Sequence, residues 1–259
     1  MLLLSWNVAG RVKRLPEQAE RLLELDADVM CLQEVTRSTL PQWRVLLEEA
    51  GYVGIEHGEL QGTGRKQPLA VLTASRTPLH AVLVDGTPWP ERVLAVHLSD
   101  GTEIVNVHSP ISPKPDLAKV RTHEALHRHL ADEAPGHARV LCGDLNTPRK
   151  EHADGTVWTF ARDRYGRLRP ERGERWDNAE LALIRGLEPY GYRDAFRIVH
   201  PQAIDEISWE WTRWGGGYRL DHLIVSESVV VEDCRYEHSW REHGLSDHSA
   251  LLAKLSLST

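Results

Sequence analysis

Polar side chains that can bind a metal ion or move a proton form six clusters beside short apolar runs. Five clusters follow such a run, and the sixth lies just before the closing run. These stretches are Ser5-Trp6-Asn7, Leu32-Gln33-Glu34, Asn106-Val107-His108-Ser109, Gly143-Asp144-Leu145-Asn146, Leu220-Asp221-His222 and Ser246-Asp247-His248. Asp144 and Asn146 alone would indicate only an Asx-turn at the end of a strand. Six such clusters argue against unrelated turns, because a buried acid or amide is costly unless it is hydrogen-bonded or belongs to a site. The pattern therefore predicts one site assembled where several strands end.

The residue types in these clusters indicate a particular chemistry. Carboxylate and amide oxygens without cysteine suit Mg²⁺ or Mn²⁺. Histidines beside carboxylates suit general acid–base catalysis and can stabilise charge on a phosphoryl oxygen. Together these groups predict metal-assisted hydrolysis of a phosphoester.

The elements that would position these clusters are strands alternating with a few amphipathic helices. Asp100-Gly101 is a strong hairpin signal, and the helices provide crossovers, so the pattern predicts an α/β fold of mixed sheets covered by helices. Strands are expected at 2–8, 27–32, 69–73, 79–84, 92–98, 103–108, 138–142, 219–225, 229–237 and 250–257. Helices are expected at 10–25, 39–50, 117–134 and 181–187.

Length and composition set further bounds. The 259 residues carry clusters from one end to the other, which favours a single domain spanning 1–259. The net charge of −7 argues against a protein that grips long nucleic acid by bulk charge, although it leaves room for a local basic groove. The three cysteines are far apart and are expected to be reduced core residues. No apolar run is long enough to span a membrane or to form a signal peptide, so a cytoplasmic monomer is the default expectation.

Two further regions leave alternatives open. Residues 149–178 are rich in arginine with interleaved aromatic residues, which indicates either a solvated loop or a segment with a few substrate-facing arginines. His123 and His127 are spaced i, i+4, but without an acid to complete a metal site they are expected on a solvated helix face.

The six clusters, in their order along the chain, resemble the motif series of the endonuclease/exonuclease/phosphatase superfamily, and they cover nearly the whole sequence. The resemblance implies a four-layer αββα sandwich, in which two mixed β-sheets pack face to face with helices outside. It also implies divalent-metal-dependent hydrolysis of phosphodiesters or phosphomonoesters.

The resemblance also implies roles for individual residues. Glu34 would be the main metal ligand, with Asn7 and Asp247 close to the metal. His248 would contact the scissile phosphate and be oriented by Asp221. The attacking water would be oriented or deprotonated by Asp144, and Asn146 would hold that water or a phosphate oxygen.

His108 marks the clearest departure from the DNA-repair branch of this family. It stands where exonuclease III-like enzymes have a tyrosine, and where pancreatic-type deoxyribonucleases and sphingomyelinases have a histidine. We assign it to the catalytic group, with no carboxylate partner that the sequence identifies.

Substrate contacts are expected from Arg92, Asn106, Trp211 and Arg219. Arg92 would contact a phosphate or make a surface salt bridge. The stretch 208–219 is rich in aromatic, basic and glycine residues. In it, Trp211 or Trp214 would stack on a base, and Arg213 or Arg219 would contact phosphates. Trp209 is instead expected to pack this loop on the sheet.

Three functions follow as hypotheses. The first is an exonuclease III-like deoxyribonuclease that uses Mg²⁺ or Mn²⁺ and takes DNA as its substrate. The second is a phosphatase or phosphodiesterase for a small molecule or lipid headgroup, which the acidic charge and His108 favour. The third is a binding module that kept the fold, which the complete set of acids, amides and histidines disfavours.

Overall fold

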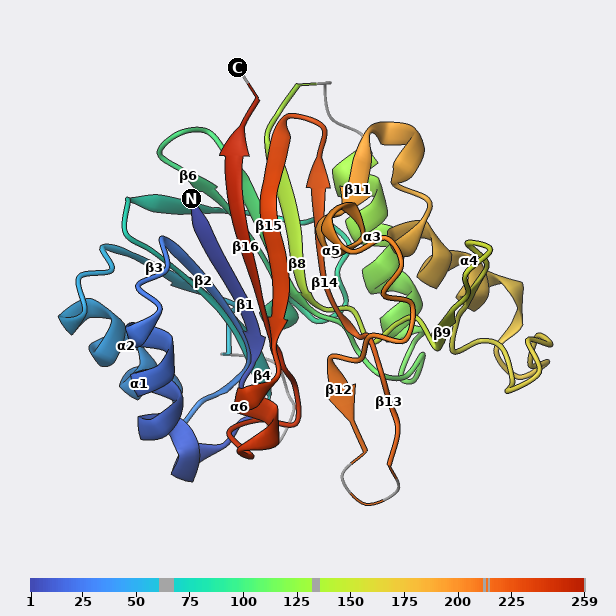
Figure 1. The fold of residues 1–259 in the computed structure, drawn as a ribbon, viewed down its shortest axis with the longest axis horizontal. Helices are drawn as coiled ribbons and strands as arrows, with labels where there is room; N and C mark the ends of the chain where they lie inside the picture. Colours follow the sequence, from blue (N-terminus) through green and yellow to red (C-terminus); the bar gives the residue numbers. More distant parts are fainter. Residues whose placement is uncertain (61–67, 132–135, 212, 214, 259) are drawn as a thin grey trace.

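Two mixed six-stranded β-sheets form the centre of the computed structural model, which describes residues 1–60, 68–131, 136–211, 213 and 215–258 (Figure 1). The first sheet has the order β15 (Val229–Glu237), β16 (Ala250–Leu257), β1 (Leu2–Asn7), β2 (Val29–Thr36), β4 (Leu69–Ser75) and β3 (Gly54–His57). The second has the order β11 (Tyr192–Asp194), β14 (Asp221–Ser226), β8 (Arg139–Asp144), β7 (Glu103–His108), β6 (Val93–Leu98) and β5 (Leu79–Val82).

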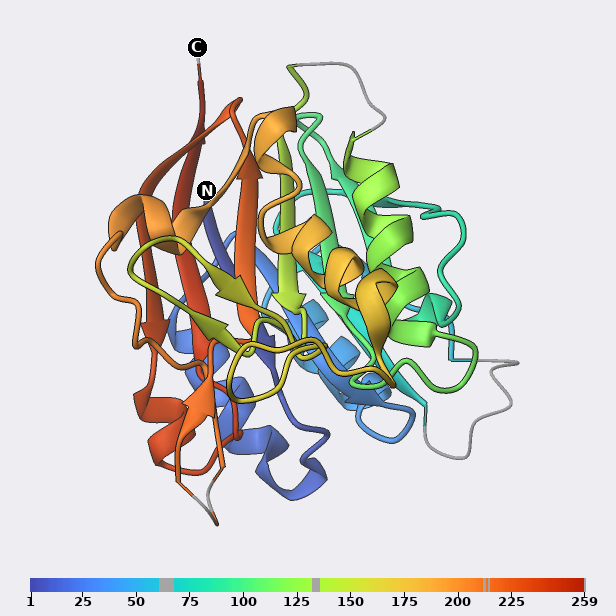
Figure 2. The same ribbon diagram turned by 90° about the vertical axis from the view of Figure 1, so that its right-hand side faces the viewer.

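Helices cover the outer face of each sheet. Figures 1 and 2 show α1 (Leu15–Glu24) and α2 (Leu40–Glu49) on one side, and α3 (Ala118–Ala131) and α4 (Gly173–Ile184) on the other. The predicted fold class, a four-layer αββα sandwich, is therefore confirmed. Shorter elements are α5 (Ala195–Val199), α6 (Ser239–Glu242), the 3₁₀ turns Val12–Arg14, Pro90–Arg92 and Glu188–Tyr190, and the ribbons β9 (Lys150–Glu151)/β10 (Val157–Trp158) and β12 (Trp209–Glu210)/β13 (Gly217–Tyr218).

Alternation along each strand divides the core into layers. Leu3 and Ile104 belong to the cluster between the two sheets. Their neighbours point the other way, with Leu4 packed beneath α1 and α2 and Val105 beneath α3 and α4. Because both faces of the sheets are covered, the central strands read as nearly continuous apolar runs.

One parallel pair in each sheet brings the polar clusters together. β1 and β2 run in parallel with Asn7 opposite Gln33, and β7 and β8 run in parallel with His108 opposite Asp144. The antiparallel strand β14 begins beside the end of β8, with Asp221 opposite Asp144. Since parallel strands end at the same edge of a sheet, this topology gathers residues distant in sequence.

Two expectations about the helices need correction. α4 begins at Gly173, inside the stretch 149–178 that was expected to be a loop, and it ends before residue 187. His123 is completely buried and hydrogen-bonded to Ser109 Oγ at 2.7 Å, so it does not lie on a solvated face. The predicted end of the third helix, at residues 132–134, falls outside the described residues. No helix in the described ranges combines the length and apolarity needed to cross a membrane.

Candidate active site

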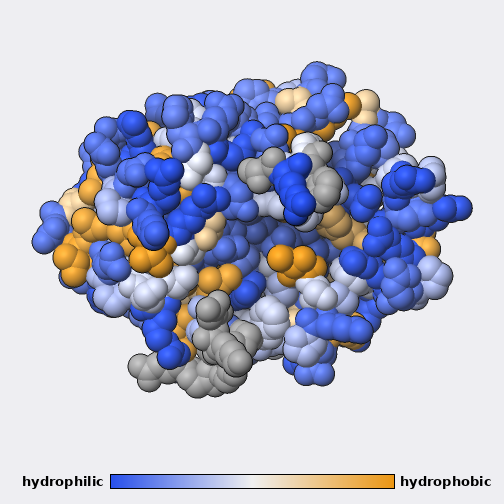
Figure 3. All heavy atoms as spheres, turned by 90° about the horizontal axis from the view of Figure 1, so that it is seen from below, coloured by the Kyte–Doolittle hydropathy of each residue, from blue (hydrophilic) through white to orange (hydrophobic). Residues whose placement is uncertain are grey.

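A cavity of about 400 Å³ opens where these strands end. Figure 3 looks onto this face of the molecule, which is hollowed near its middle. The lining residues are Glu34, His108, Ile111, Asp144, Asn146, Phe160, Arg172, Trp209, Trp211, Tyr218, Leu220, Asp247 and His248. A larger cavity, of about 590 Å³, lies beside the other edge of the second sheet. Its acids and arginines include the ion pairs Arg219–Glu151 and Arg197–Glu151, so these charged side chains stabilise the fold.

Glu34 reaches the cavity because β2 bulges just before it. The register between β2 and β4 shifts between Leu32 and Val35, and Glu34 has a φ of +59°. A bulge re-aims a side chain, and a positive φ at a residue other than glycine is concentrated at functional sites. Asn7 Nδ2 then donates to Glu34 Oε1 at 3.2 Å and to Asp144 Oδ2 at 3.1 Å, which holds the two carboxylates close together.

The turn that carries Asp144 and Asn146 depends on Gly143. Gly143 has a φ of +126°, and a Cβ atom there would come 2.0 Å from the carbonyl oxygen of Val107 on the neighbouring strand. Only glycine allows this close approach. Beyond it, Asn146 donates from its backbone N to Asp144 Oδ1 at 2.9 Å and from Nδ2 to Ser109 O at 2.8 Å. The carboxylate and the amide are therefore both fixed in place.

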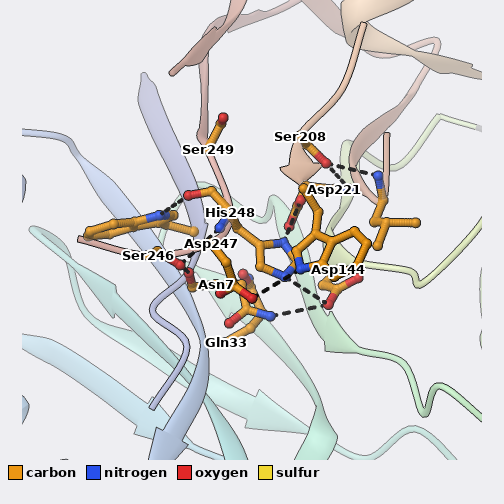
Figure 4. Close-up of polar contacts among 12 residues, drawn as sticks. Asn7, Gln33, Asp144, Ser208, Asp221, Ser246, Asp247, His248 and Ser249 are labelled. Atoms are coloured by element: carbon orange, nitrogen blue, oxygen red, sulfur yellow. Dashed lines mark hydrogen bonds and ion pairs between the residues drawn. The ribbon is translucent and has the colours of Figure 1, made fainter. Parts of the chain in front are cut away.

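His248 lies between two carboxylates, as Figure 4 shows. Its Nδ1 is 2.8 Å from Asp221 Oδ2, and its Nε2 is 3.9 Å from Asp144 Oδ2. Burial opposes a charge on this imidazole, but the carboxylates of Asp221 and Asp144 outweigh burial and raise the pKa of His248 to about 10. His248 is therefore an imidazolium at neutral pH.

His108 is held in the opposite state. Burial lowers the pKa of His108 well below its ordinary value, and the positive charges of Arg92 and His248 lower it further. Its Nε2 lies 3.5 Å from Glu34 Oε1 and 3.8 Å from Asp144 Oδ2, whereas its buried Nδ1 has no hydrogen-bond partner in the part of the chain described. His108 is a neutral imidazole at neutral pH.

Asp144 lies between these two histidines. Burial raises the pKa of Asp144 to about 7; the positive charge of His248 opposes this shift, and the negative charges of Asp221 and Glu34 add to it. Titratable neighbours whose pKa values are pushed apart mark the acid and base of an active site. The arrangement can therefore offer a charged acid, a carboxylate poised near neutrality and a neutral imidazole within one cavity.

A buried ion pair supports this turn from below. The side chains of Lys119 and Glu180 are 1% and 0% exposed and lie 2.5 Å apart, and Lys119 Nζ also donates to Asn146 O at 2.6 Å. Glu180 accepts further hydrogen bonds from Thr147 Oγ1 and from the backbone N of Phe160. The network joins α3 and α4 to the turn after β8. The sequence analysis missed it, although Lys119, His123 and Leu126 share the helical spacing of a buried face.

Two of the predicted substrate contacts are wrong. Asn106 is fully buried and donates to Leu32 O and Leu72 O of the other sheet, so it links the sheets rather than facing substrate. The guanidinium of Arg219 is 3% exposed and ion-paired with Glu151 at 2.7 Å and Asp194 at 2.8 Å. Both residues are polar and lie near the end of a strand, as expected of site residues. Their side chains, however, bind other parts of the protein.

The remaining predicted residues lie at or beside the cavity. Asp247 lines it and accepts a hydrogen bond from Trp209 Nε1 at 3.0 Å. Trp209 also stacks on Tyr218 across the β12/β13 ribbon, in agreement with its expected packing role. Trp211 lines the cavity and is 47% exposed. Arg92 lies behind His108, with Nη1 3.4 Å from His108 Nε2, and Trp214 falls outside the described residues.

Several residues of the cavity lining were not predicted from the sequence. Ile111, Phe160, Tyr218 and Leu220 are the aromatic and aliphatic ones, and Arg172 also lines the cavity. The alternation of arginine and aromatic residues over 149–178 was the available signal, but it did not single out Phe160 or Arg172.

Comparisons with known proteins identify the family and the fold. The model of the endonuclease/exonuclease/phosphatase family matches residues 4–248. Exodeoxyribonuclease III from Haemophilus influenzae is 24% identical, and the match covers 89% of this chain and 89% of that protein. An AP endonuclease structure from Archaeoglobus fulgidus superimposes with a TM-score of 0.72 at 19% identity, covering 99% of this chain and all of the other. A humanized D. rerio TDP2 with 14 mutations superimposes with a TM-score of 0.67 at 16% identity, covering 99% and 98% of the two chains.

Proposed function

The chain belongs to the endonuclease/exonuclease/phosphatase family, and we propose that it is a divalent-metal-dependent nuclease that hydrolyses phosphodiester bonds in DNA. The observation that carries the proposal is the placement of a charged His248 and a neutral His108 on either side of Asp144. A phosphoryl-transfer site needs a cation for the developing charge and a base for the attacking water. A binding module would not need this opposition of protonation states.

Each polar group then has a role in the proposed reaction. Asp144, with its pKa near neutrality, takes a proton from the attacking water, and Asn146 helps to hold that water. His248 stays protonated and stabilises negative charge on the phosphoryl oxygens. The carboxylate of Asp221 maintains the positive charge on His248. His108 supplies a neutral ring nitrogen beside Asp144.

The donor set suits a magnesium or manganese ion. Glu34 and Asp247 line the cavity with side chains that are 25% and 35% exposed. Glu34 makes no ion pair with Lys or Arg in the described chain, and Asp247 makes a long one with Arg11, at 3.9 Å. No three His, Cys, Asp or Glu side chains of the described residues converge to hold an ion alone. Mg²⁺ binds in just this manner, through one or two carboxylates plus waters and substrate phosphate oxygens.

We assign Glu34 and Asp247 as the residues that hold the ion, which when bound would polarise the phosphoryl group. Asn7 directs its amide nitrogen toward the carboxylates and its Oδ1 toward Ala9 N, so in this arrangement it orients Glu34 and Asp144. Its predicted role as a ligand stays a prediction. A rise in melting temperature on adding Mg²⁺ or Mn²⁺, lost in Glu34→Gln, would test the site independently of activity.

DNA is proposed as the substrate because a relative by sequence is named exodeoxyribonuclease III, because a structure of the same fold is named an AP endonuclease, and because aromatic side chains line the cavity together with the acids. Aromatic side chains stack on bases of any sequence. The sequence-based expectation of a cytoplasmic monomer is kept as part of this proposal. A phosphatase or phosphodiesterase for a small phosphoester is the second candidate, favoured by the net charge of −7 and by His108.

A substrate panel separates these candidates. Purified protein is assayed with Mg²⁺, Mn²⁺ or EDTA on linear duplex, single-stranded DNA, an abasic-site duplex, RNA, a generic phosphodiester and a generic phosphomonoester. We expect metal-dependent DNA cleavage that falls steeply with salt, because phosphate contacts release counterions. Turnover confined to small esters, with release of inorganic phosphate and little salt dependence, would favour the second candidate. Absence of turnover on every substrate would contradict both.

Trp211→Ala is expected to weaken DNA binding about tenfold, since stacking of a base on an aromatic ring contributes about 1–3 kcal/mol. Dissociation constants are measured in EDTA, where no cleavage occurs. The matched control is Tyr190→Ala, because Tyr190 is similarly exposed, at 51% against 47% for Trp211, but lies outside the cavity. An equal loss in both variants, or none in either, would remove Trp211 from the binding surface.

A further inference from the structure

Two kinds of side chain line the cavity. Acids and histidines from the strand ends are one kind, and aromatic and aliphatic side chains are the other. Arg172 is the one Lys or Arg that lines the cavity in the described part of the chain. It comes from the long segment between β8 and α4 and directly precedes α4.

The guanidinium of Arg172 is held by a rigid support. Its Cζ lies 3.7 Å from the centroid of the Trp176 ring, and its Nη1 donates to Phe160 O at 3.0 Å. Trp176 is 2% exposed, and both Trp176 Nε1 and the backbone N of Phe160 donate to Glu180. A guanidinium fixed in this way loses little conformational freedom when it binds a ligand.

No carboxylate forms an ion pair with this arginine in the described chain. Arg172 Nε and Nη2 also have no hydrogen-bond partner among the described residues. Burial and the positive charges of Arg169 and Arg149 lower the pKa of Arg172, whereas the negative charges of Glu180 and Glu171 oppose this shift. The unpaired donor groups Nε and Nη2 match the oxygens of a phosphate.

We propose that Arg172 binds a second phosphate of the substrate, adjacent in the nucleotide chain to the phosphate that is cleaved. This inference rests on the proposed nuclease function. In this arrangement the scissile phosphate lies beside Glu34 and His248. The intervening nucleoside lies against the aromatic side chains of the lining, and the neighbouring phosphate reaches Arg172. The site thereby selects substrates that carry two phosphates in sequence over isolated diesters.

Three short substrates test the proposal. Thymidylyl-thymidine has the scissile phosphate only, and its 5′-phosphorylated and 3′-phosphorylated forms add a second phosphate on one side or the other. Dissociation constants are measured in EDTA and kcat/KM with Mg²⁺. We expect the wild type to bind one phosphorylated form about 10- to 100-fold more tightly than the unphosphorylated one, which is the range for a charge-assisted hydrogen bond.

Arg172→Gln is expected to abolish this preference and to leave the unphosphorylated dinucleotide within about threefold of wild type. Arg172→Lys keeps the positive charge but lacks the planar pair of N–H donors of a guanidinium, so it should retain part of the preference. Arg164→Gln is the matched control, because Arg164 belongs to the same segment but is exposed against Tyr165. Melting temperatures confirm that the variants are folded.

The outcomes separate this inference from the proposed function. If Arg172→Gln weakens all three dinucleotides equally, or none, the second-phosphate site is refuted. If the wild type cleaves no dinucleotide and no DNA, yet binds a phosphorylated form tightly through Arg172, the nuclease proposal fails and the phosphate site stands.

Discussion

Replacing Asp144 by asparagine is expected to lower kcat by on the order of 10³-fold, because it removes the base of the proposed reaction. The asparagine oxygen can still accept from the Asn146 backbone N, which donates to Asp144 at 2.9 Å, but the new amide nitrogen replaces the Oδ2 that accepts from Asn7 Nδ2. The missing charge is the one that lies 3.9 Å from His248 Nε2 and 3.8 Å from His108 Nε2. Cleavage of DNA and of a generic phosphodiester at saturating substrate measures the loss.

The same change is not expected to destabilise the fold at alkaline pH. The pKa of Asp144 is raised from 3.8 to about 7 in the folded protein, so the folded state binds more protons than the unfolded state between these values. Stability contributed by this group therefore falls as pH rises through that window, by at most roughly 4 kcal/mol. Asp144→Asn lacks this dependence.

Melting curves in EDTA at about pH 5 and about pH 8 measure the difference. The wild type should lose stability relative to Asp144→Asn on going from the lower to the higher pH. A variant that is slow because it is misfolded would instead melt earlier at both pH values. A variant that retains near-normal kcat would refute the assignment of Asp144 as the base.

Sequence patterns predicted the strand ends well because the apolar runs and the polar residues that follow them are local features. Asn7, Glu34 and Asp144 lie where a run of core residues ends, and His248 lies just before β16, which begins at Ala250. Their convergence depends on the parallel pairing of β1 with β2 and of β7 with β8, which local pattern does not specify. The ordered motif series supplied that information, since it implies the topology as a whole.

Local pattern cannot distinguish a polar residue at a site from one that holds the fold together. Asn106 follows the same rule as His108, yet it bonds across to the first sheet, whereas His108 faces the cavity two residues later. Period-2 alternation puts the two on the same side of β7, so what separates them is depth in the sheet, a tertiary property.

Buried charge is the feature that sequence reasoning handles worst. Lys119 and Glu180 were not expected inside, because charged residues are rarely fully buried unless they are paired. The pair becomes intelligible only when α3 and α4 pack together, with Lys119 also bound to Asn146 O. Arg172 was hidden for the same reason, since its support by Trp176 requires the start of α4.

Asp221→Asn is expected to convert the activity from one that persists at alkaline pH to one that falls as pH rises through neutrality. Burial opposes the charge on His248, and Asp221 is the largest of the groups that overcome it to give a pKa of about 10. Without that carboxylate, burial dominates and the pKa of His248 falls. We expect about a 10²-fold lower kcat than wild type at about pH 8. The deficit relative to wild type should shrink near about pH 6, where both proteins lose activity because Asp144, with its pKa of about 7, becomes protonated.

The sign of the effect follows from which form of His248 is active. A histidine with a raised pKa keeps its charge up to the folded pKa. The stability linked to the shift is complete below the unfolded pKa and is lost as pH rises from there through the folded pKa. The wild type should therefore show no loss from His248 until about pH 10, whereas Asp221→Asn should lose activity several pH units earlier. Profiles of kcat against pH measure the shift, with Asp205→Asn as an exposed acidic control. Parallel profiles in wild type and Asp221→Asn would mean that Asp221 only orients the ring. A displaced profile would show that the charge which Asp221 sustains on His248 is used in the reaction.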